Sequence, residues 1–348
     1  MRLGASHGTT DTGRKRRRNE DAFVCVPPLF AVADGMGGAQ AGEVASELAA
    51  ATLRDSQTID GGEDRVVALV REANRRVHER AATDASASGM GTTITAALVA
   101  PDGTIAVGHV GDSRAYRLRD GDLEQLTDDH SLVAELVRRG ELSPAEAEVH
   151  PQRSVITRAL GTDADIDVDA FTTVGVAGDL YLLCSDGLSS MVDSRAINEI
   201  LVRSRADLTA AARALVDAAN RSGGEDNVTV VLFELVDDDE LPAAGEPSER
   251  TREYATRVPD DEDTLHPEDR LRIPDQVDTI VVSAADVQAA LDEGSDGRGA
   301  QIGHVPEQEQ EPEPPPHRAG VGQHLLALLV IVGLSALIVF LVWRGLAR

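Results

Sequence analysis

The feature that most constrains the fold of this chain is a series of short apolar runs, several of which end in an aspartate beside a glycine or another small residue. Short β-branched runs bounded by Gly, Asp and Pro are typical of β-strands. We therefore predict strands over residues 30–33, 93–99, 104–110, 180–184 and 228–235. Aromatic residues make up only 3% of the chain, so the core is expected to be aliphatic.

Between these runs lie longer segments whose apolar residues recur every three or four positions, the spacing of an amphipathic helix. These segments predict helices over residues 40–54, 65–80, 129–139, 194–203 and 208–219. Pro101 and Gly103 lie between two strand runs and indicate a hairpin turn. Mixed strand pairs and helices over residues 1–236 indicate one α+β domain in which helices cover sheets.

Residues 237–323 have a different composition and are predicted to be an acidic, Pro-rich, disordered linker. Residues 237–320 hold 23 Asp and Glu against 7 Lys and Arg, which is −16 of the formal net charge of −27. This acidity disfavours nucleic acid as a partner. A more apolar stretch at 279–291 has three interpretations: unstructured linker, transient helix or docking motif.

Residues 324–343 predict a single transmembrane helix, followed by a short tail at 344–348. The 19 residues from Leu325 to Trp343 carry no charge and would span about 28 Å as a helix. A buried core helix is the alternative. The N-terminus has no apolar signal-peptide core, so we expect a protein of the cell membrane whose main domain is cytoplasmic, with Cys25 and Cys184 reduced.

The chain shows no sequence pattern for a side-chain nucleophile, a P-loop or an HExxH zinc site. Five acidic motifs stand out instead, at Asn19-Glu20-Asp21, Asp34-Gly35, Gly111-Asp112, Ser185-Asp186-Gly187 and Glu225-Asp226-Asn227. Each one alone is readily explained as a turn. Together they indicate carboxylates that converge on hard divalent cations such as Mg²⁺ or Mn²⁺. A pair of such ions would activate a water molecule to attack a phosphoryl group.

In order along the chain, these motifs, with Gly91-Thr92-Thr93, resemble those of the PPM (PP2C-type) serine/threonine protein phosphatases, in particular the bacterial membrane-anchored branch. The resemblance covers residues from about 5 to 236. It implies an αββα sandwich of two antiparallel β-sheets flanked by helices. It also implies two bound Mn²⁺ or Mg²⁺ ions, and a third ion as in bacterial members.

The resemblance assigns the binuclear centre to four residues. Asp34 would bridge both ions, and the carbonyl oxygen of Gly35 would bind one of them. Asp186 and Asp226 would complete the centre. These residues are separated by up to 192 positions in the sequence, so only the fold can bring them together.

Five further residues have roles that the resemblance implies. Glu20 and Asp21 would hold metal-bound waters. Asp112 would help bind the third ion, which Ser154 would reach from a neighbouring loop. Arg16 occupies the position of the phosphate-binding arginine, and a guanidinium fork suits a phosphate dianion.

The family's animal members have a histidine where this chain has Met36, and a thioether cannot protonate a leaving group. His130 and His150 lie in the region of the family's mobile flap. Either could help to protonate the leaving group, but a structural role is expected. His109 is interpreted as a core histidine. The resemblance implies hydrolysis of phosphoserine and phosphothreonine on proteins, with membrane Ser/Thr kinases and their substrates as partners. The alternatives are a phosphatase for one regulatory protein and an inactive membrane-tethered sensing module. A two-metal nuclease is disfavoured by the acidic charge.

Overall fold

The computed structural model describes residues 1–37, 41–56, 61–84, 87–237 and 280–281. These residues belong to one compact unit, which extends from Met1 to Asp292. The predicted linker at 237–323 lies outside the described residues except for positions 237, 280 and 281, and the predicted membrane helix and tail lie wholly outside them. Within the described ranges, no helix combines the length and the apolar character needed to cross a bilayer.

One sheet is built from five antiparallel strands that come from both ends of the domain. In spatial order they are β1 (Arg2–Asp11), β12 (Val228–Val236), β11 (Leu180–Cys184), β7 (Arg114–Arg119) and β8 (Asp122–Gln125). Because β1 pairs with β12, the two ends of the described domain are held side by side.

The second sheet is also antiparallel. Its order is β10 (Asp169–Val174), β6 (Thr104–Val110), β5 (Ile94–Val99), β3 (Leu29–Met36) and β2 (Asp21–Val26), and the short β4 (Gly91–Thr92) pairs with the end of β3. The hairpin predicted at Gly103 is present, since β5 pairs with β6 and Gly103 has a φ of +84°.

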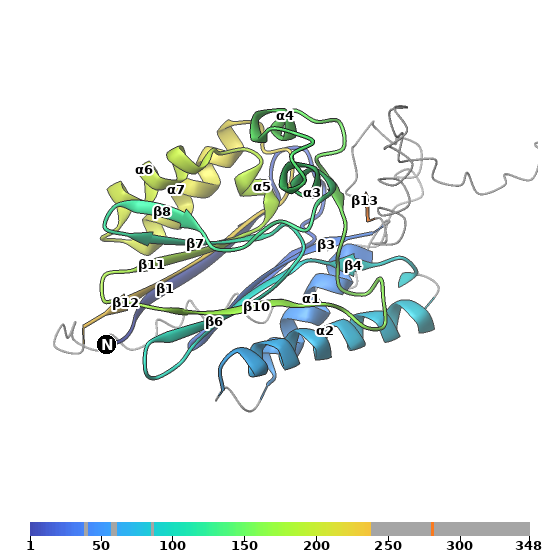
Figure 1. Cartoon of the computed structure of the whole chain (residues 1–348), viewed down its shortest axis with the longest axis horizontal. Helices are drawn as coiled ribbons and strands as arrows, with labels where there is room; N and C mark the ends of the chain where they lie inside the picture. Colours follow the sequence, from blue (N-terminus) through green and yellow to red (C-terminus); the bar gives the residue numbers. More distant parts are fainter. Residues whose placement is uncertain (38–40, 57–60, 85–86, 238–279, 282–348) are drawn as a thin grey trace, which may run out of the picture. The chain divides into compact units, whose positions relative to one another are not determined.

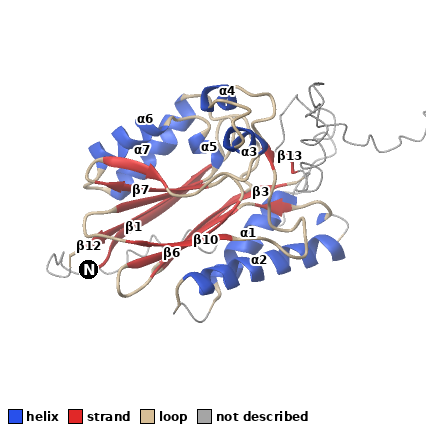
Figure 2. Ribbon diagram, viewed as in Figure 1, coloured by secondary structure: helices blue, strands red, loops and turns tan. Residues whose placement is uncertain are grey.

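Helices cover the outer face of each sheet, which gives four layers (Figures 1 and 2). The second sheet carries α1 (Ala41–Arg54) and α2 (Glu63–Thr83). The first carries α5 (Asp186–Ser189), α6 (Ser194–Ser204) and α7 (Leu208–Arg221). Two short helices, α3 (Leu132–Arg138) and α4 (Pro144–Glu148), follow β8 and precede the two-residue strand β9 (Val155–Ile156). The predicted αββα sandwich is therefore confirmed.

The core has three principal layers, one between the sheets and one under each set of helices. The helix–sheet layers are aliphatic, as predicted, with Tyr116 the aromatic exception. The layer between the sheets is different, because Phe30 stacks on Phe233 at 4.2 Å and Tyr181 stacks on the same ring at 5.0 Å. The buried residues of this layer are still mostly aliphatic, and three of the few aromatic residues of the chain gather among them.

Candidate metal centre

The centre of the site is a pair of aspartates that face each other across two neighbouring strands. Asp21 begins β2, Asp34 lies near the end of β3, and the two residues are register partners in the antiparallel ladder. Like charges directly opposite each other in a sheet are destabilising. The hydrophobic stretch of β3 that precedes Asp34 is buried, so this pair is held in place by the core rather than by its own interactions.

Three more aspartates approach this pair from other parts of the chain. Asp186 is the first residue of α5, one residue after β11, and its carboxylate lies close to that of Asp34. Asp226 precedes β12, and Asp112 lies in the turn between β6 and β7. Asp34 is close enough to the other four carboxylates for each of them to raise its pKa. The structure thus brings together five predicted site residues from five separate segments.

Burial and mutual repulsion make these carboxylates hard to ionise. Burial is the largest cause of the raised pKa of Asp34, followed by the charges of Asp21 and Asp186. Burial, with repulsion from Asp226 and Asp186, raises the pKa of Asp21 to about 7 against the opposing hydrogen bonds of Thr229 and Ser185. Asp186 has its pKa raised to about 6, and Asp112 is shifted in the same direction. Such a cluster favours a neighbouring positive charge.

The polar atoms of the cluster fit divalent cations. One oxygen of Asp21, Oδ1, and one of Asp112, Oδ1, are buried without a hydrogen-bond partner, although buried oxygens are almost always satisfied. All donor atoms in the set are oxygens, which Mg²⁺ and Mn²⁺ prefer. Against this, no three His, Cys, Asp or Glu side chains among the described residues are already arranged to hold an ion. Rotation of the carboxylates alone would change these distances, and the unpartnered oxygens and the shared repulsion favour a bound cation.

Hydroxyl groups fix the orientation of Asp21. Its Oδ2 accepts hydrogen bonds from Ser185 Oγ at 2.8 Å and Thr229 Oγ1 at 2.6 Å. Thr229 in turn contacts Thr10 Oγ1 at 2.6 Å, which accepts from the side chain of Asn19 at 2.8 Å. These contacts hold one oxygen of Asp21 and leave the other facing the cluster.

Close backbone approach explains the glycine after Asp34. The N–H of Gly35 donates to the carbonyl oxygen of Glu20 at 3.0 Å. A Cβ at Gly35 would lie 2.1 Å from the carbonyl oxygen of Gly42, so no other residue fits without moving the backbone. The Glu20 carboxylate itself lies against Gly42, since a Cβ at Gly42 would lie 2.8 Å from Glu20 Oε2.

Arg16 lies at the rim of the cluster. Its Nη2 donates to Asp226 Oδ2 at 2.9 Å, and both side chains are about a quarter exposed. Asp226 also accepts from the backbone N–H of Asn227. The structure thus places the predicted phosphate-binding arginine beside a predicted metal ligand, where one guanidinium could contact both the carboxylate and an incoming anion.

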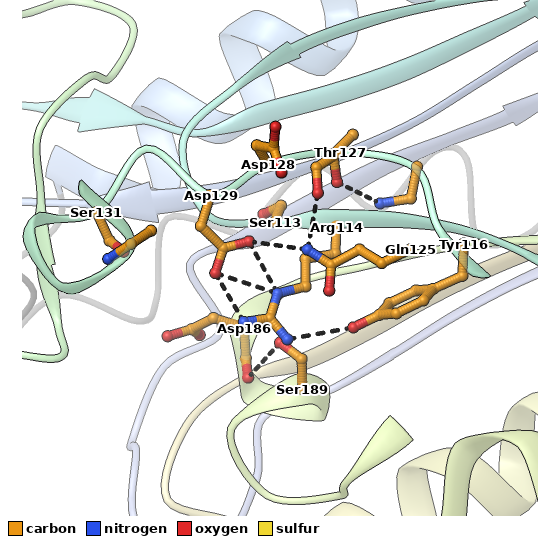
Figure 3. A network of polar contacts seen from close by, with 12 residues as sticks. Ser113, Arg114, Tyr116, Gln125, Thr127, Asp128, Asp129, Ser131, Asp186 and Ser189 are labelled. Atoms are coloured by element: carbon orange, nitrogen blue, oxygen red, sulfur yellow. Dashed lines mark hydrogen bonds and ion pairs between the residues drawn. The ribbon is translucent and has the colours of Figure 1, made fainter. Parts of the chain in front are cut away.

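A second arginine beside the centre had no assigned role at the level of sequence. Arg114 makes a bidentate ion pair with Asp129, at 2.9 Å from Nε to Oδ1 and 2.7 Å from Nη2 to Oδ2 (Figure 3). Its Nη1 also donates to Tyr116 at 3.2 Å. Asp186 lies close by, and the positive charge of Arg114 counteracts the rise in its pKa. The dipeptide Ser113-Arg114 was part of the motif, but its partner Asp129 could not be deduced from sequence.

The turn that carries Asp112 is fastened by a histidine. Gly111 has a φ of +113°, and its N–H donates to His130 Nδ1 at 3.0 Å, while the N–H of His130 returns a bond to Gly111 O at 2.7 Å. Because Nδ1 accepts, the ring proton is on Nε2, which lies 3.1 Å from Asp169 Oδ2. His130 is only 2% exposed, so its role is structural, as expected.

His109 and His150, the other two histidines considered in the sequence, make structural contacts. His109 is 1% exposed, and its ring nitrogens contact Thr95 Oγ1 at 2.9 Å and Asp128 O at 3.1 Å, which confirms a core histidine. Its pKa is lowered to about 3, mainly by burial and also by His130. His150 Nδ1 accepts from the N–H of Gln152 in the loop before β9, a local contact.

Ser154 is not placed in the carboxylate cluster. It is half-buried and directly precedes β9, whose Ile156 forms an isolated bridge with Ser131. Residue 130 in turn contacts Gly111, beside Asp112. Ser154 is therefore connected to Asp112 through the 130–131 segment, and its role as a metal ligand stays a prediction.

Two supporting residues were not recognised as such from sequence. Asn227 is 4% exposed, and its amide fastens the connection between β1 and β2 by accepting from Glu20 N and donating to Thr12 O and Arg18 O. Thr93 Oγ1 accepts from the N–H of Asp34 at 3.0 Å. Both lie in the recognised motifs, so the signal was present, but their partners are 59 to 215 positions away in the sequence.

Comparison with known proteins adds independent evidence. The family model described as protein phosphatase 2C matches residues 13–219. A serine/threonine phosphatase of Listeria monocytogenes is 41% identical over 237 residues, which cover 65% of this chain and 93% of the relative. The protein phosphatase PstP of Mycobacterium tuberculosis is 43% identical over 233 residues, which cover 66% of this chain but only 45% of that protein.

A solved structure has the same fold. The crystal structure of the catalytic domain of PstP in complex with two manganese ions is 38% identical, with a TM-score of 0.62, and the match covers 68% of this chain and 99% of that one. The family model spans more than half of the chain, and the match to the Listeria enzyme covers nearly all of its length. This chain therefore belongs to the protein phosphatase 2C family.

Proposed function

We propose that this protein hydrolyses phosphoserine and phosphothreonine on other proteins with Mn²⁺ or Mg²⁺ bound among its clustered aspartates. The single observation that carries the proposal is the convergence of five carboxylates whose buried oxygens include two without a partner. The names of the relatives and the two manganese ions in the PstP crystal structure support the same conclusion.

The residues that would hold the ions are those that the family resemblance assigns, and five of them are the clustered aspartates. Asp34, Asp186 and Asp226 would bind the pair, with the Gly35 carbonyl and, through waters, Glu20 and Asp21. Asp112 would bind a third ion with Ser154. The chemistry that such ions supply when bound is activation of water and neutralisation of phosphoryl charge.

The remaining steps depend on side chains of the chain itself. Arg16 can bind a phosphate oxygen from its place beside Asp226, with charge-assisted hydrogen bonds. Met36 cannot donate a proton; it is 5% exposed and packs with Ile156 and Ala159. His130 is excluded as a proton donor to the leaving group because both of its ring nitrogens are engaged.

We further propose that the enzyme acts at the cell membrane and opposes Ser/Thr kinases there, with those kinases and their substrates as partners. The support is the uncharged apolar run at 325–343 in the sequence. A tether of this kind raises the effective concentration of the enzyme near other membrane proteins. Deletion of residues 324–348 is expected to move the protein from the membrane fraction to the soluble fraction, and unchanged fractionation would refute the anchor.

The activity is tested with the full chain on matched phosphoserine, phosphothreonine and phosphotyrosine peptides, with Mn²⁺ and with a chelator. We expect turnover of the first two peptides only with the metal. Asp34→Asn should lower turnover at least about 100-fold, because even the loss of an outer partner of a metal ligand costs about 10-fold to 100-fold.

The matched control is Asp217→Asn, which makes the same change at an exposed position of α7. It should leave turnover unchanged. Metal-independent turnover, or full activity of Asp34→Asn, would reject the assignment of the site. Zero turnover of all peptides and of a chromogenic phosphate ester with Mn²⁺ would favour a sensing module, whereas activity on a single partner protein alone would favour a phosphatase for one regulatory protein.

A further inference from the structure

A short strand from the C-terminal region is paired with the phosphatase domain next to the candidate site. Ile280 and Val281 form β13, which is labelled in Figure 1. It runs parallel to β9, with Ile280 opposite Val155 and Val281 opposite Ile156. β9 and β13 form a separate two-stranded sheet. No part of the proposed function uses this pairing.

β9 has one edge occupied by the domain and one edge that receives β13. The N–H of Thr157 donates to His130 O at 2.9 Å, on the side where Ile156 bridges to Ser131. Successive N–H groups of a strand point to opposite edges. The N–H of Ile156 therefore faces the other edge, which is the edge that β13 covers.

The segment that β13 covers packs against the end of β3, the strand that carries Asp34. Ser154 immediately precedes β9, and Ile156 is 2% exposed. Ile156 forms a small buried cluster with Met36 and Ala159, and Met36 is two residues after Asp34. A strand added to β9 therefore stabilises a segment that packs against the metal-binding strand.

The occupant is an apolar segment within an acidic stretch of sequence. Residues 279–283 read TIVVS, between Asp278 and later acidic residues. β-Branched residues such as these favour an added strand, and addition of a strand to an open edge is a common mode of peptide recognition. The 43 residues between Val236 and Ile280 keep this segment on the same molecule, which raises its effective concentration.

We propose that Ile280 and Val281 are an intramolecular docking strand for the edge of β9, and that docking holds the 154–157 segment against Met36. A segment of the C-terminal region then binds the phosphatase domain of the same chain. This inference stands independently of the proposed activity, because it concerns backbone pairing alone.

The test is amide hydrogen exchange of the full chain at residue resolution, without substrate. Ile280→Pro removes the backbone donor and disfavours pairing. We expect exchange at the Ile156 amide to be about fivefold to tenfold faster in this variant, the effect of one or two lost backbone hydrogen bonds. The matched control is Ile302→Pro, the same change elsewhere in the C-terminal region, which should exchange as the wild type does.

A rescue separates docking from a general disturbance. A peptide of residues 274–288 added to the Ile280→Pro protein should restore slow exchange at Ile156, and the same peptide with proline at 280 should not. Equal exchange in wild type and Ile280→Pro, or no rescue, would overturn the proposal. Protection that falls on dilution of the wild type would assign the strand to a second copy of the chain and refute the intramolecular docking.

Discussion

Replacing Asp21 by asparagine is expected to stabilise the metal-free protein and to weaken its stabilisation by divalent cations. Burial, with repulsion from Asp226 and Asp186, raises the pKa of Asp21 from 3.8 to about 7. Between these two values the folded state keeps a proton that the unfolded chain has released. The free energy of unfolding of the metal-free protein therefore falls as the pH rises from about 4 to 7.

The size of the effect follows from the same numbers. A difference of about three pH units, at about 1.36 kcal/mol per unit, amounts to about 4 kcal/mol. Partial exposure of the residue, and proton uptake by Asp34 or Asp186 in its place, reduce this toward about 2 kcal/mol. Asparagine cannot ionise, and its oxygen can still accept the hydrogen bonds of Ser185 and Thr229. At pH 8 the variant should thus gain about 2–4 kcal/mol in chelator.

Bound cations are expected to reduce this difference. Metal that binds only the folded state stabilises it by about 2.7 kcal/mol at a hundredfold excess over its Kd. Asp21→Asn weakens a predicted outer partner of the ions, so its gain in Mn²⁺ should be smaller than that of the wild type.

The assay is urea unfolding followed by far-UV circular dichroism, at pH 4 to 8, with chelator or Mn²⁺. Circular dichroism is preferred because the single tryptophan, Trp343, lies outside the described fold. The exposed Asp217→Asn variant is the control and should follow the wild type. Equal urea midpoints of wild type and Asp21→Asn at pH 8 in chelator would refute the reasoning, as would a flat pH dependence of the wild type.

Three further predictions concern a buried ion pair at the far end of β11 and two residues beside the site. Asp179 is 1% exposed and accepts from Arg119 Nε and Nη2 at 2.7 and 2.6 Å, so Asp179→Ala should cost about 3 kcal/mol in urea unfolding at pH 7. Burial opposes ionisation of Asp179, but these bonds lower its pKa overall. The difference in stability between wild type and Asp179→Ala should therefore vanish as acid protonates the carboxylate below about pH 4. A stability difference that persists there would contradict the ion pair. Arg114→Lys loses the bidentate geometry to Asp129, so it should raise KM for a phosphopeptide while the urea midpoint changes little. An unchanged KM would show that Arg114 does not support the site. His130→Ala leaves the N–H of Gly111 unpaired and should destabilise the protein by about 1–3 kcal/mol, with faster amide exchange at Gly111, and unchanged exchange there would refute the fastening of the Asp112 turn.

The sequence predicted those elements whose pattern is local. The apolar runs at 180–184 and 228–235 are β11 and β12 within one residue, and the helix predicted at 194–203 is α6. Strand β1 was not predicted, because none of its residues is fully buried and its register is supplied by β12, more than 200 positions away. A pattern within ten residues shows which face is apolar, but not which strand lies beside it.

The same distinction holds at the site. The acidic motifs, and with them the family, could be recognised from sequence alone, because turn chemistry and the order of motifs are properties of neighbouring residues. Only the tertiary structure decided that Asp21 lies opposite Asp34, that Arg16 pairs with Asp226, and that Ile280 lies beside β9. Those contacts depend on strand register and core packing between segments 13 to 210 positions apart, which no local pattern contains.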